Sequence, residues 1–378
     1  MESMHLAHPD LVPAVRTAAE VIAVPRREQE TSFTLHAPLE LLARVGLLPY
    51  LDDETRAGAL TRISRLADTY AATGTPVATP AAVEFPDPMA AAVELAAALR
   101  AGAGDRVDAI ACWLAPRVDH TLARHLLAPA IVDSLAAAGH APIGLHLLPR
   151  VAGGGLSLAL LRGALRSIAR QPAWRIDWFA QAITTSAPVT LRDALAAVPR
   201  LGPTGSSFIY PLMSQVQQSG VATRVLGPAL APDLDVAAAT RTLLRAAAWS
   251  MLHEDPRRAP YGWSHCLSMP QAVLTLTDDG VPARTAVAVA ATHVAGFRAA
   301  YATQALPSLA DDASEADPSP PNEHELASFA ALHANEHLVK YTLACLHACA
   351  TDPAWRSTYL RAAAYLADWW RAHPDGES

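Results

Sequence analysis

The chain has 378 residues, with 29 Lys and Arg against 36 Asp and Glu and a formal net charge of -7. The basic residues are dispersed, so we expect no nucleic-acid partner, because binding to phosphate backbones requires clustered basic side chains. Hydrophobic residues make up 51% and charged residues 17%, which indicates a globular chain rather than a disordered one.

No signal for secretion or membrane insertion is visible. Residues 1–5 lack a basic region followed by an apolar stretch, and the most apolar segment, 281–297, is interrupted by charged and polar residues. Two of the four cysteines, Cys345 and Cys349, lie four residues apart in a predicted helix, where a disulfide fits poorly. We therefore expect reduced thiols, no membrane partner and a cytoplasmic location.

Stretches of helical length that are rich in alanine and leucine follow one another along the chain, and alternating β-branched runs are nearly absent. Breaks that contain proline or glycine separate these stretches. The pattern predicts an all-α fold, a single large multi-helix domain over 1–378, with helices at Arg56–Ala72, Met89–Ala101, Thr121–Ala138, Leu156–Arg170, Val236–His253 and Ala283–Ala305.

Towards the C-terminus, the acidic, proline-containing segment 311–321 (DDASEADPSPP) predicts a flexible loop. A helix is then expected from Asn335 to Ala350. Asp352 followed by Pro353 predicts the N-cap of a terminal helix that ends near Trp370.

Lys340 is the only lysine in the chain, since every other residue of the basic set is arginine. Arginine replaces lysine well on a solvated face, but it does not become a neutral amine at physiological pH. A lysine that survives this bias can mark a site that needs amine chemistry. The alternative is a lysine left by chance.

Helical spacing predicts that His333, His337 and Lys340 share one face, with His347 continuing it. An adjoining apolar stripe is expected to face the core, formed by Leu332, Val339, Leu343 and Leu346.

A buried ammonium at Lys340 would need an acidic partner such as Glu336 or Asp352, a depressed pKa, or covalent modification. Addition of carbon dioxide to a neutral amine would give a carbamate with carboxylate-like oxygens. The salt bridge and the carbamate both remain open.

The segment from His333 to His337 (HANEH) also matches the H-x-x-E-H pattern of inverted zinc hydrolases, in which two histidines bind zinc and a glutamate acts as base. Such a site needs a third protein ligand, and no acidic helix with that role follows in the sequence. No glycine cluster lies in a βαβ unit and Gly-x-Ser-x-Gly is absent, which disfavours a Rossmann enzyme and a serine hydrolase.

Four segments, in this order, resemble the questin oxidase-like family over most of the chain: Phe33–Pro38, Leu147–Arg162, Tyr261–Val273 and, most specifically, Asn335–Leu346 (NEHLVKYTLACL). The resemblance implies a mostly helical fold with a buried pocket for metal and substrate. It also implies a metal centre of histidines and a carboxylated lysine, which places ligands at His36, His265, His337 and Lys340.

One departure from the family concerns a Thr-His-Gly-like element, which is replaced here by an apolar stretch around Leu158. One implied ligand is therefore missing. Either His120, His125 or His146 substitutes for it, or the metal is held by fewer ligands, or the chemistry has been lost or changed.

The leading hypothesis is a non-haem Fe(II) oxygenase that uses O2 on an aromatic, polycyclic secondary metabolite. Tyr261, Trp263 and His333 are candidate residues of its substrate pocket. One alternative is a degenerate helical protein that binds a small molecule without oxygenase activity. Another is an NADPH-dependent Baeyer-Villiger-type oxidase, against which the missing dinucleotide motif counts.

Overall fold

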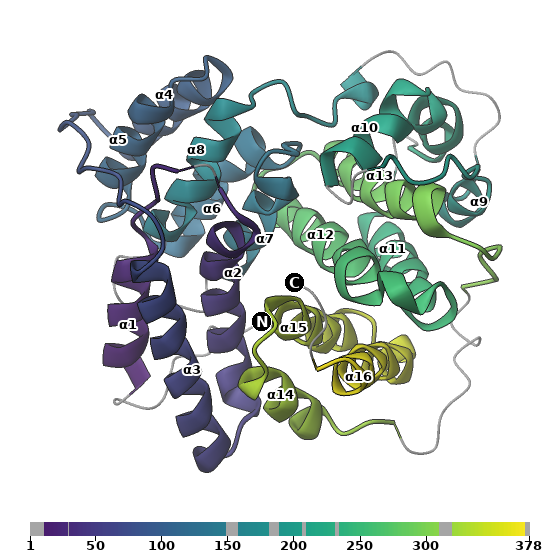
Figure 1. Cartoon of the computed structure of the whole chain (residues 1–378). Helices are drawn as coiled ribbons and strands as arrows, with labels where there is room; N and C mark the ends of the chain where they lie inside the picture. Colours follow the sequence, from purple (N-terminus) through teal and green to yellow (C-terminus); the bar gives the residue numbers. More distant parts are fainter. Residues whose placement is uncertain are drawn as a thin grey trace. The chain divides into compact units, whose positions relative to one another are not determined.

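A computed structural model describes residues 11–28, 30–148, 158–180, 189–205, 209–230, 234–309 and 320–374. Helices make up most of these ranges (Figure 1). The only β-type pairings among the described residues are two isolated bridges, Arg26 with Pro76 and Ser134 with Arg175. The predicted all-α fold is confirmed. Every helix in the described ranges is too short or too polar to span a membrane. Of the predicted loop at 311–321, all but the last two residues lie outside the described residues.

The chain divides into two compact units, of which the first comprises 1–175 with 278–280. In this unit α2 packs against α1, α3 and α7, while α4 packs against α5, α6 and α8. Its α-helices are α1 (Leu11–Ile22), α2 (Ser32–Leu47), α3 (Asp53–Ala71), α4 (Pro88–Arg100), α5 (Gly104–Leu114), α6 (His120–Ile131), α7 (Ala141–Leu147) and α8 (Arg162–Arg170).

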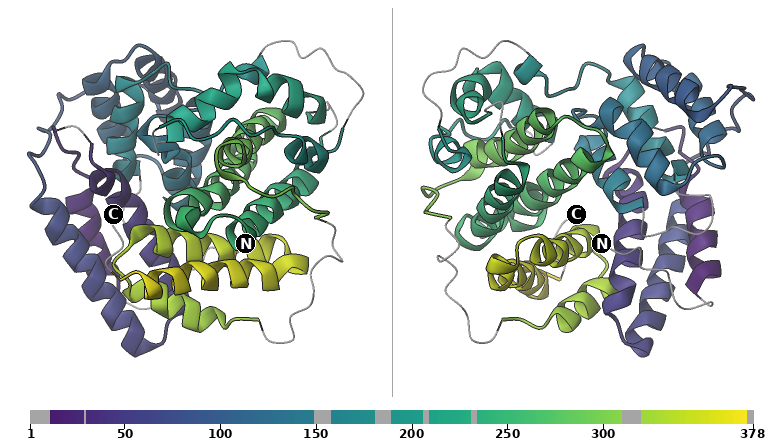
Figure 2. Two further views of the ribbon diagram at one scale, coloured as in Figure 1. Left: turned by 45° about the vertical axis from the view of Figure 1, so that its right-hand side comes forward. Right: turned by 180° about the vertical axis from the view of Figure 1, so that it is seen from behind.

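The second unit comprises 176–277 with 281–378. Its helix α12 packs against α11, α13 and α15, and α15 in turn packs against α14 and α16, which both views of Figure 2 show side by side with it. The α-helices are α9 (Leu191–Ala196), α10 (Ile209–Gln218), α11 (Val236–His253), α12 (Ser264–Thr275), α13 (Ala283–Tyr301), α14 (Glu323–Leu332), α15 (Glu336–Thr351) and α16 (Arg356–Ala372). A single domain over 1–378 stays a prediction.

The helix predicted over Thr121–Ala138 is wrong in its second half. Helix α6 ends at Ile131, and the backbone N–H of Leu135 donates to the carbonyl of Trp174 at 2.8 Å. Ala137, Ala138 and Gly139 then adopt left-handed φ angles of 51°, 52° and 69°. The two alanines are the only non-glycine residues with positive φ among the described residues. Since this conformation costs an L-residue about 1–2 kcal/mol, the turn is strained.

The strain makes Ala138→Gly a stabilising change. Glycine adopts the left-handed region without a steric penalty, and its own entropy cost is smaller, so we expect the free energy of unfolding to rise by about 1 kcal/mol. The matched control is Ala97→Gly on the exposed side of α4, which should lower stability by about 1 kcal/mol. Urea unfolding measures both. If Ala138→Gly and Ala97→Gly destabilise the protein equally, the backbone at Ala138 is not strained.

His293 on α13 gives the fold a pH dependence. Its side chain is 2% exposed, and burial lowers its pKa from 6.5 to about 4. As the pH falls from 6.5 towards 4, the unfolded chain takes up a proton that the folded chain excludes. Stability should therefore fall over this window by up to about 3 kcal/mol through this residue.

The test compares urea unfolding of wild type and His293→Leu at pH 7 and pH 4.5. The variant should lose less stability than wild type between pH 7 and pH 4.5. The control His253→Leu, at an exposed position, should lose as much as wild type. If His293→Leu loses as much stability as wild type over this pH range, His293 does not take up a proton on unfolding.

Candidate metal centre

Helix α15 positions the predicted pair His337 and Lys340. Its N-cap is Asn335, whose side-chain oxygen accepts hydrogen bonds from the backbone N–H groups of His337 at 2.9 Å and Leu338 at 3.2 Å. The cap satisfies donors that a helix start leaves open, so it determines where the helix begins. His337 then lies in the first turn and Lys340 one turn later, and their residue exposures are 4% and 5%.

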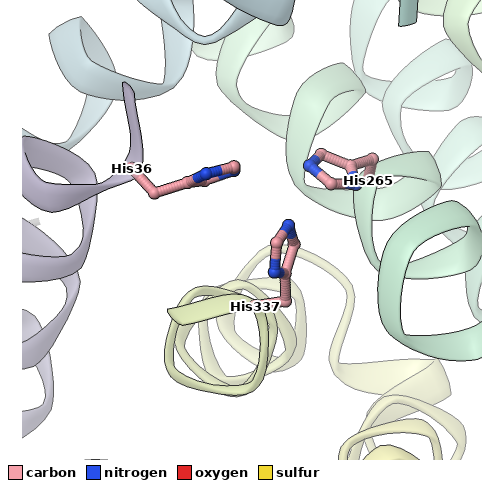
Figure 3. Close-up of side chains that lie close together, drawn as sticks. All are labelled: His36, His265 and His337. Carbon is pink, nitrogen blue, oxygen red and sulfur yellow. The ribbon is translucent and has the colours of Figure 1, made fainter. Parts of the chain in front are cut away.

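Packing of α12 against α15 brings His265 to His337. Their ring centroids are 4.9 Å apart at an interplanar angle of 68°, and each offers a ligand nitrogen within 4.8 Å of the other's. Figure 3 shows both imidazoles, each with one ring nitrogen turned towards the space between them. The ring of Tyr261 lies edge-on to His337 at 5.0 Å. Three residues predicted from the sequence thus meet within the second unit.

The backbone selects the tautomer of His265. Its Nδ1 lies 2.9 Å from the carbonyl oxygen of Tyr261, one helical turn earlier. Because a carbonyl only accepts, Nδ1 carries the proton and Nε2 presents a lone pair. In the first unit, His36 on α2 has the same arrangement, with Nδ1 at 2.7 Å from the carbonyl of Ser32. Holding the second ring nitrogen in this way orients metal-binding histidines in general.

Burial keeps the histidines of the second unit neutral. It lowers the pKa of His265 well below the usual value, and the nearby charges of His337 and Lys340 lower it further. The pKa of His337 is likewise depressed by burial and then by Lys340. At neutral pH both imidazoles are therefore in the form that binds a metal.

Two carboxylates had been candidates for the lysine's partner. Asp352 accepts hydrogen bonds from Arg245 Nε at 2.7 Å and Nη2 at 2.8 Å and from the Tyr359 hydroxyl at 2.9 Å. This network engages both of its oxygens. Asp352 occupies the N-cap position before Pro353, as predicted, but its side chain makes no cap hydrogen bond there. Glu336 Oε1 lies 3.3 Å from His337 Nδ1.

The shared helical face predicted for His333 and His337 is wrong. His333 is the C-cap of α14 with an extended backbone, and its Nδ1 accepts the N–H of Asn335 at 3.0 Å. The Asn335 cap begins a new helix between the two histidines, so the helical H-x-x-E-H geometry is not formed. Leu332, expected in the core, is 40% exposed.

The candidate pocket residues have different surroundings. His333 contacts the ring of Trp370, with centroids 5.5 Å apart. Trp263 is fully buried in the π-helical turn Ala259–Trp263 and lies edge-on to Tyr301 at 6.3 Å. For both, a role in substrate binding stays a prediction.

A histidine whose ring contacts that of His36 in the first unit was missed from the sequence. His140 is 2% exposed, and its ring lies 4.5 Å from that of His36 at 60°. We had considered His120, His125 and His146 as substitutes for the missing ligand. The Gly139 and Pro142 that flank His140 were a usable signal, since both residue types end a helix.

The donors of the second unit suit a first-row transition metal. His265 presents an Nε2 lone pair, His337 is neutral, and a buried lysine lies one helical turn after His337. No protein family, curated protein or solved structure matches the chain. The resemblance to the questin oxidase-like family therefore stays a prediction.

Proposed function

We propose that the protein is a non-haem iron-dependent oxygenase that acts with O2 on an aromatic or polycyclic, polyketide-type secondary metabolite. Its Fe(II) ligands would be His36, His265, His337 and a carboxylated Lys340. The observation that supports this best is the buried pair of neutral imidazoles on α12 and α15, beside the only lysine of the chain.

Each residue has a defined task in this proposal. The Tyr261 carbonyl holds His265 with Nε2 available, and Glu336 Oε1 lies 3.3 Å from Nδ1 of His337. The neutral amine of Lys340 would attack carbon dioxide, forming an N–C bond and releasing one proton, which leaves a carbamate with one negative charge. This charge would offset that of a dication held by neutral imidazoles. Iron, when bound, supplies the redox chemistry and the open positions that O2 requires.

Metal analysis of anaerobically prepared protein supplied with iron and bicarbonate tests the proposal. Wild type should hold one iron per chain, and His265→Ala, His337→Ala and His36→Ala should each lose most of it. Matched controls are His253→Ala and His373→Ala, because these exposed histidines make the same contact to a backbone carbonyl, at 2.9 Å and 2.8 Å. Wild type without iron, or ligand variants with full iron, would refute the proposed centre.

A degenerate binding protein is the second candidate, favoured by the apolar character of the segment where a ligand was expected. Leu158 in that segment is fully buried. The discriminating result is a folded protein that binds aromatic compounds but takes up no iron in the presence of bicarbonate. A yellow preparation or NADPH consumption would instead favour the Baeyer-Villiger-type oxidase.

A further inference from the structure

We propose that the first unit binds a small monocarboxylate, of the class of formate, acetate and bicarbonate, in a cavity bordered by α1, α2, α3 and α8. The cation that binds it is Arg26, which lies between α1 and α2. All residues that line this cavity belong to the first unit. The proposal therefore does not depend on the iron centre.

The cavity is small and has both apolar and cationic walls. It encloses about 30 Å³, which exceeds the roughly 10–15 Å³ that one water molecule needs and suits a group of a few heavy atoms. Its apolar walls include Ile22, Leu39 and Leu42, whose side chains offer no hydrogen bonds. Its cationic lining residues are Arg26, Arg166 and Arg170.

Two of these arginines have a buried N–H group without an acceptor. The Nε atoms of Arg26 and Arg166 are both buried, and neither has a hydrogen-bond partner among the described residues. Buried donors in folded proteins are nearly always satisfied, and a charged donor that lacks an acceptor is especially costly. Because both residues line the same cavity, an acceptor within it is the simplest way to satisfy them.

The guanidinium of Arg26 is already fixed by Tyr70. Its Nη2 donates to the Tyr70 carbonyl at 2.7 Å, and its central carbon lies 4.4 Å from the centroid of the Tyr70 ring. The Tyr70 hydroxyl in turn donates to the carbonyl of Val24 at 3.1 Å. An anion that binds to Arg26 would therefore immobilise little further side-chain freedom.

Arg26 is also the one cation of the cavity that lacks a carboxylate partner among the described residues. Arg170 pairs with Glu30 at 2.6 Å, and Arg166 lies 3.2 Å from a carboxylate oxygen of Asp105. Arg26 makes no ion pair within the described ranges, so one positive charge remains to be balanced. A planar guanidinium matches the two oxygens of a carboxylate better than it matches a spherical halide.

The remaining carboxylate of the cavity lining, that of Glu28, limits the charge of the ligand. Its two oxygens accept the backbone N–H of Thr75 at 2.9 and 2.8 Å. It makes no ion pair with Arg26, but the two charges interact at longer range. Together with Glu30, it disfavours a dianion such as phosphate, and this leaves a monoanion.

The experiment titrates the full chain with ¹³C-formate and follows the formate line width by NMR. Formate is the probe because it does not form a carbamate with Lys340. Wild type should bind it saturably, and Arg26→Gln should bind it about tenfold or more weakly, the loss expected for a charged hydrogen bond. The matched control is Arg27→Gln, since Arg27 is exposed and does not line the cavity, and it should keep the wild-type affinity.

A second variant tests the cavity without changing Arg26. Gly163 lines it, and a Cβ at this position would meet no atom within 4 Å, so Gly163→Leu should fold while its side chain takes up the ligand's space. Its formate affinity should fall as in Arg26→Gln. Circular dichroism reports whether each variant is folded, and Gly163→Leu decides if Arg26→Gln does not fold.

Competition identifies the class of ligand. Acetate and bicarbonate should displace formate from wild type, whereas chloride at equal ionic strength should not. The inference is overturned by wild type that does not bind formate saturably, by equal weakening in Arg27→Gln, or by unchanged affinity in Gly163→Leu. Displacement by chloride as effective as by acetate would overturn the assignment to a carboxylate.

Discussion

Under the proposed function, Lys340→Arg is expected to remove nearly all bound iron and all oxygenase activity while leaving the protein folded. Arginine keeps the positive charge and much of the length of the side chain, but its guanidinium does not form a carbamate. At 5% exposure, Lys340 lies on the same helix as His337 and lowers the pKa values of both His337 and His265, so its chemical state affects both imidazoles. Iron per chain and substrate turnover measure the effect.

The single lysine makes a direct test available. Wild type supplied with ¹³C-bicarbonate should show a carbamate resonance by ¹³C NMR that is absent from Lys340→Arg, because no other lysine contributes. Lys340→Glu, which provides a permanent carboxylate, should retain part of the iron. Full iron content and activity in Lys340→Arg would eliminate the carbamate, and would leave the salt-bridge interpretation of this lysine.

Asp352→Ala is expected to have the largest effect on stability, a loss of about 3–5 kcal/mol, because it leaves a buried guanidinium without its carboxylate. Asp352 is 1% and Arg245 4% exposed, and the two are joined by paired hydrogen bonds of 2.7 and 2.8 Å. Arg245 also donates to the Leu309 carbonyl at 2.8 Å. The network thus connects α11 to the start of the last helical segment.

Urea unfolding provides the measurement. The control is Asp255→Ala, whose partner Arg257 has a side chain that is 88% exposed, so about 0–1 kcal/mol should be lost. Replacing both buried partners, as in Asp352→Leu with Arg245→Met, should recover much of the stability, since it removes both charges together. A loss in Asp352→Ala no greater than in the control would show that the buried pair is not needed.

Local structure was predicted correctly from the sequence at several places. Alanine- and leucine-rich stretches between proline and glycine breaks predicted the helical class, and the bounds Val236–His253 match α11. Asn335 caps α15, so His337 and Lys340 share a helix as predicted. These features depend on interactions within one or two helical turns, which adjacent residues determine.

The same local reasoning was incomplete where a second element competes. Asp352 is the N-cap of the turn Pro353–Trp355 that leads into α16, as predicted, but its carboxylate binds Arg245 and Tyr359 rather than the N–H groups of its own helix start. Spacing alone placed His333 in line with His337, but the cap at Asn335 starts a new helix between them.

Distant contacts depended on the tertiary structure. His265 meets His337 because α12 and α15 pack together. Residue spacing did not indicate that pairing, which was expected only through the family resemblance. His140 reaches His36 through two left-handed alanines, a conformation that intrinsic preferences oppose and that Ser167 helps to hold. Interactions between residues close in sequence determine where the helices start and place Lys340 one turn after His337. The two imidazole pairs instead depend on packing between segments that are far apart in sequence.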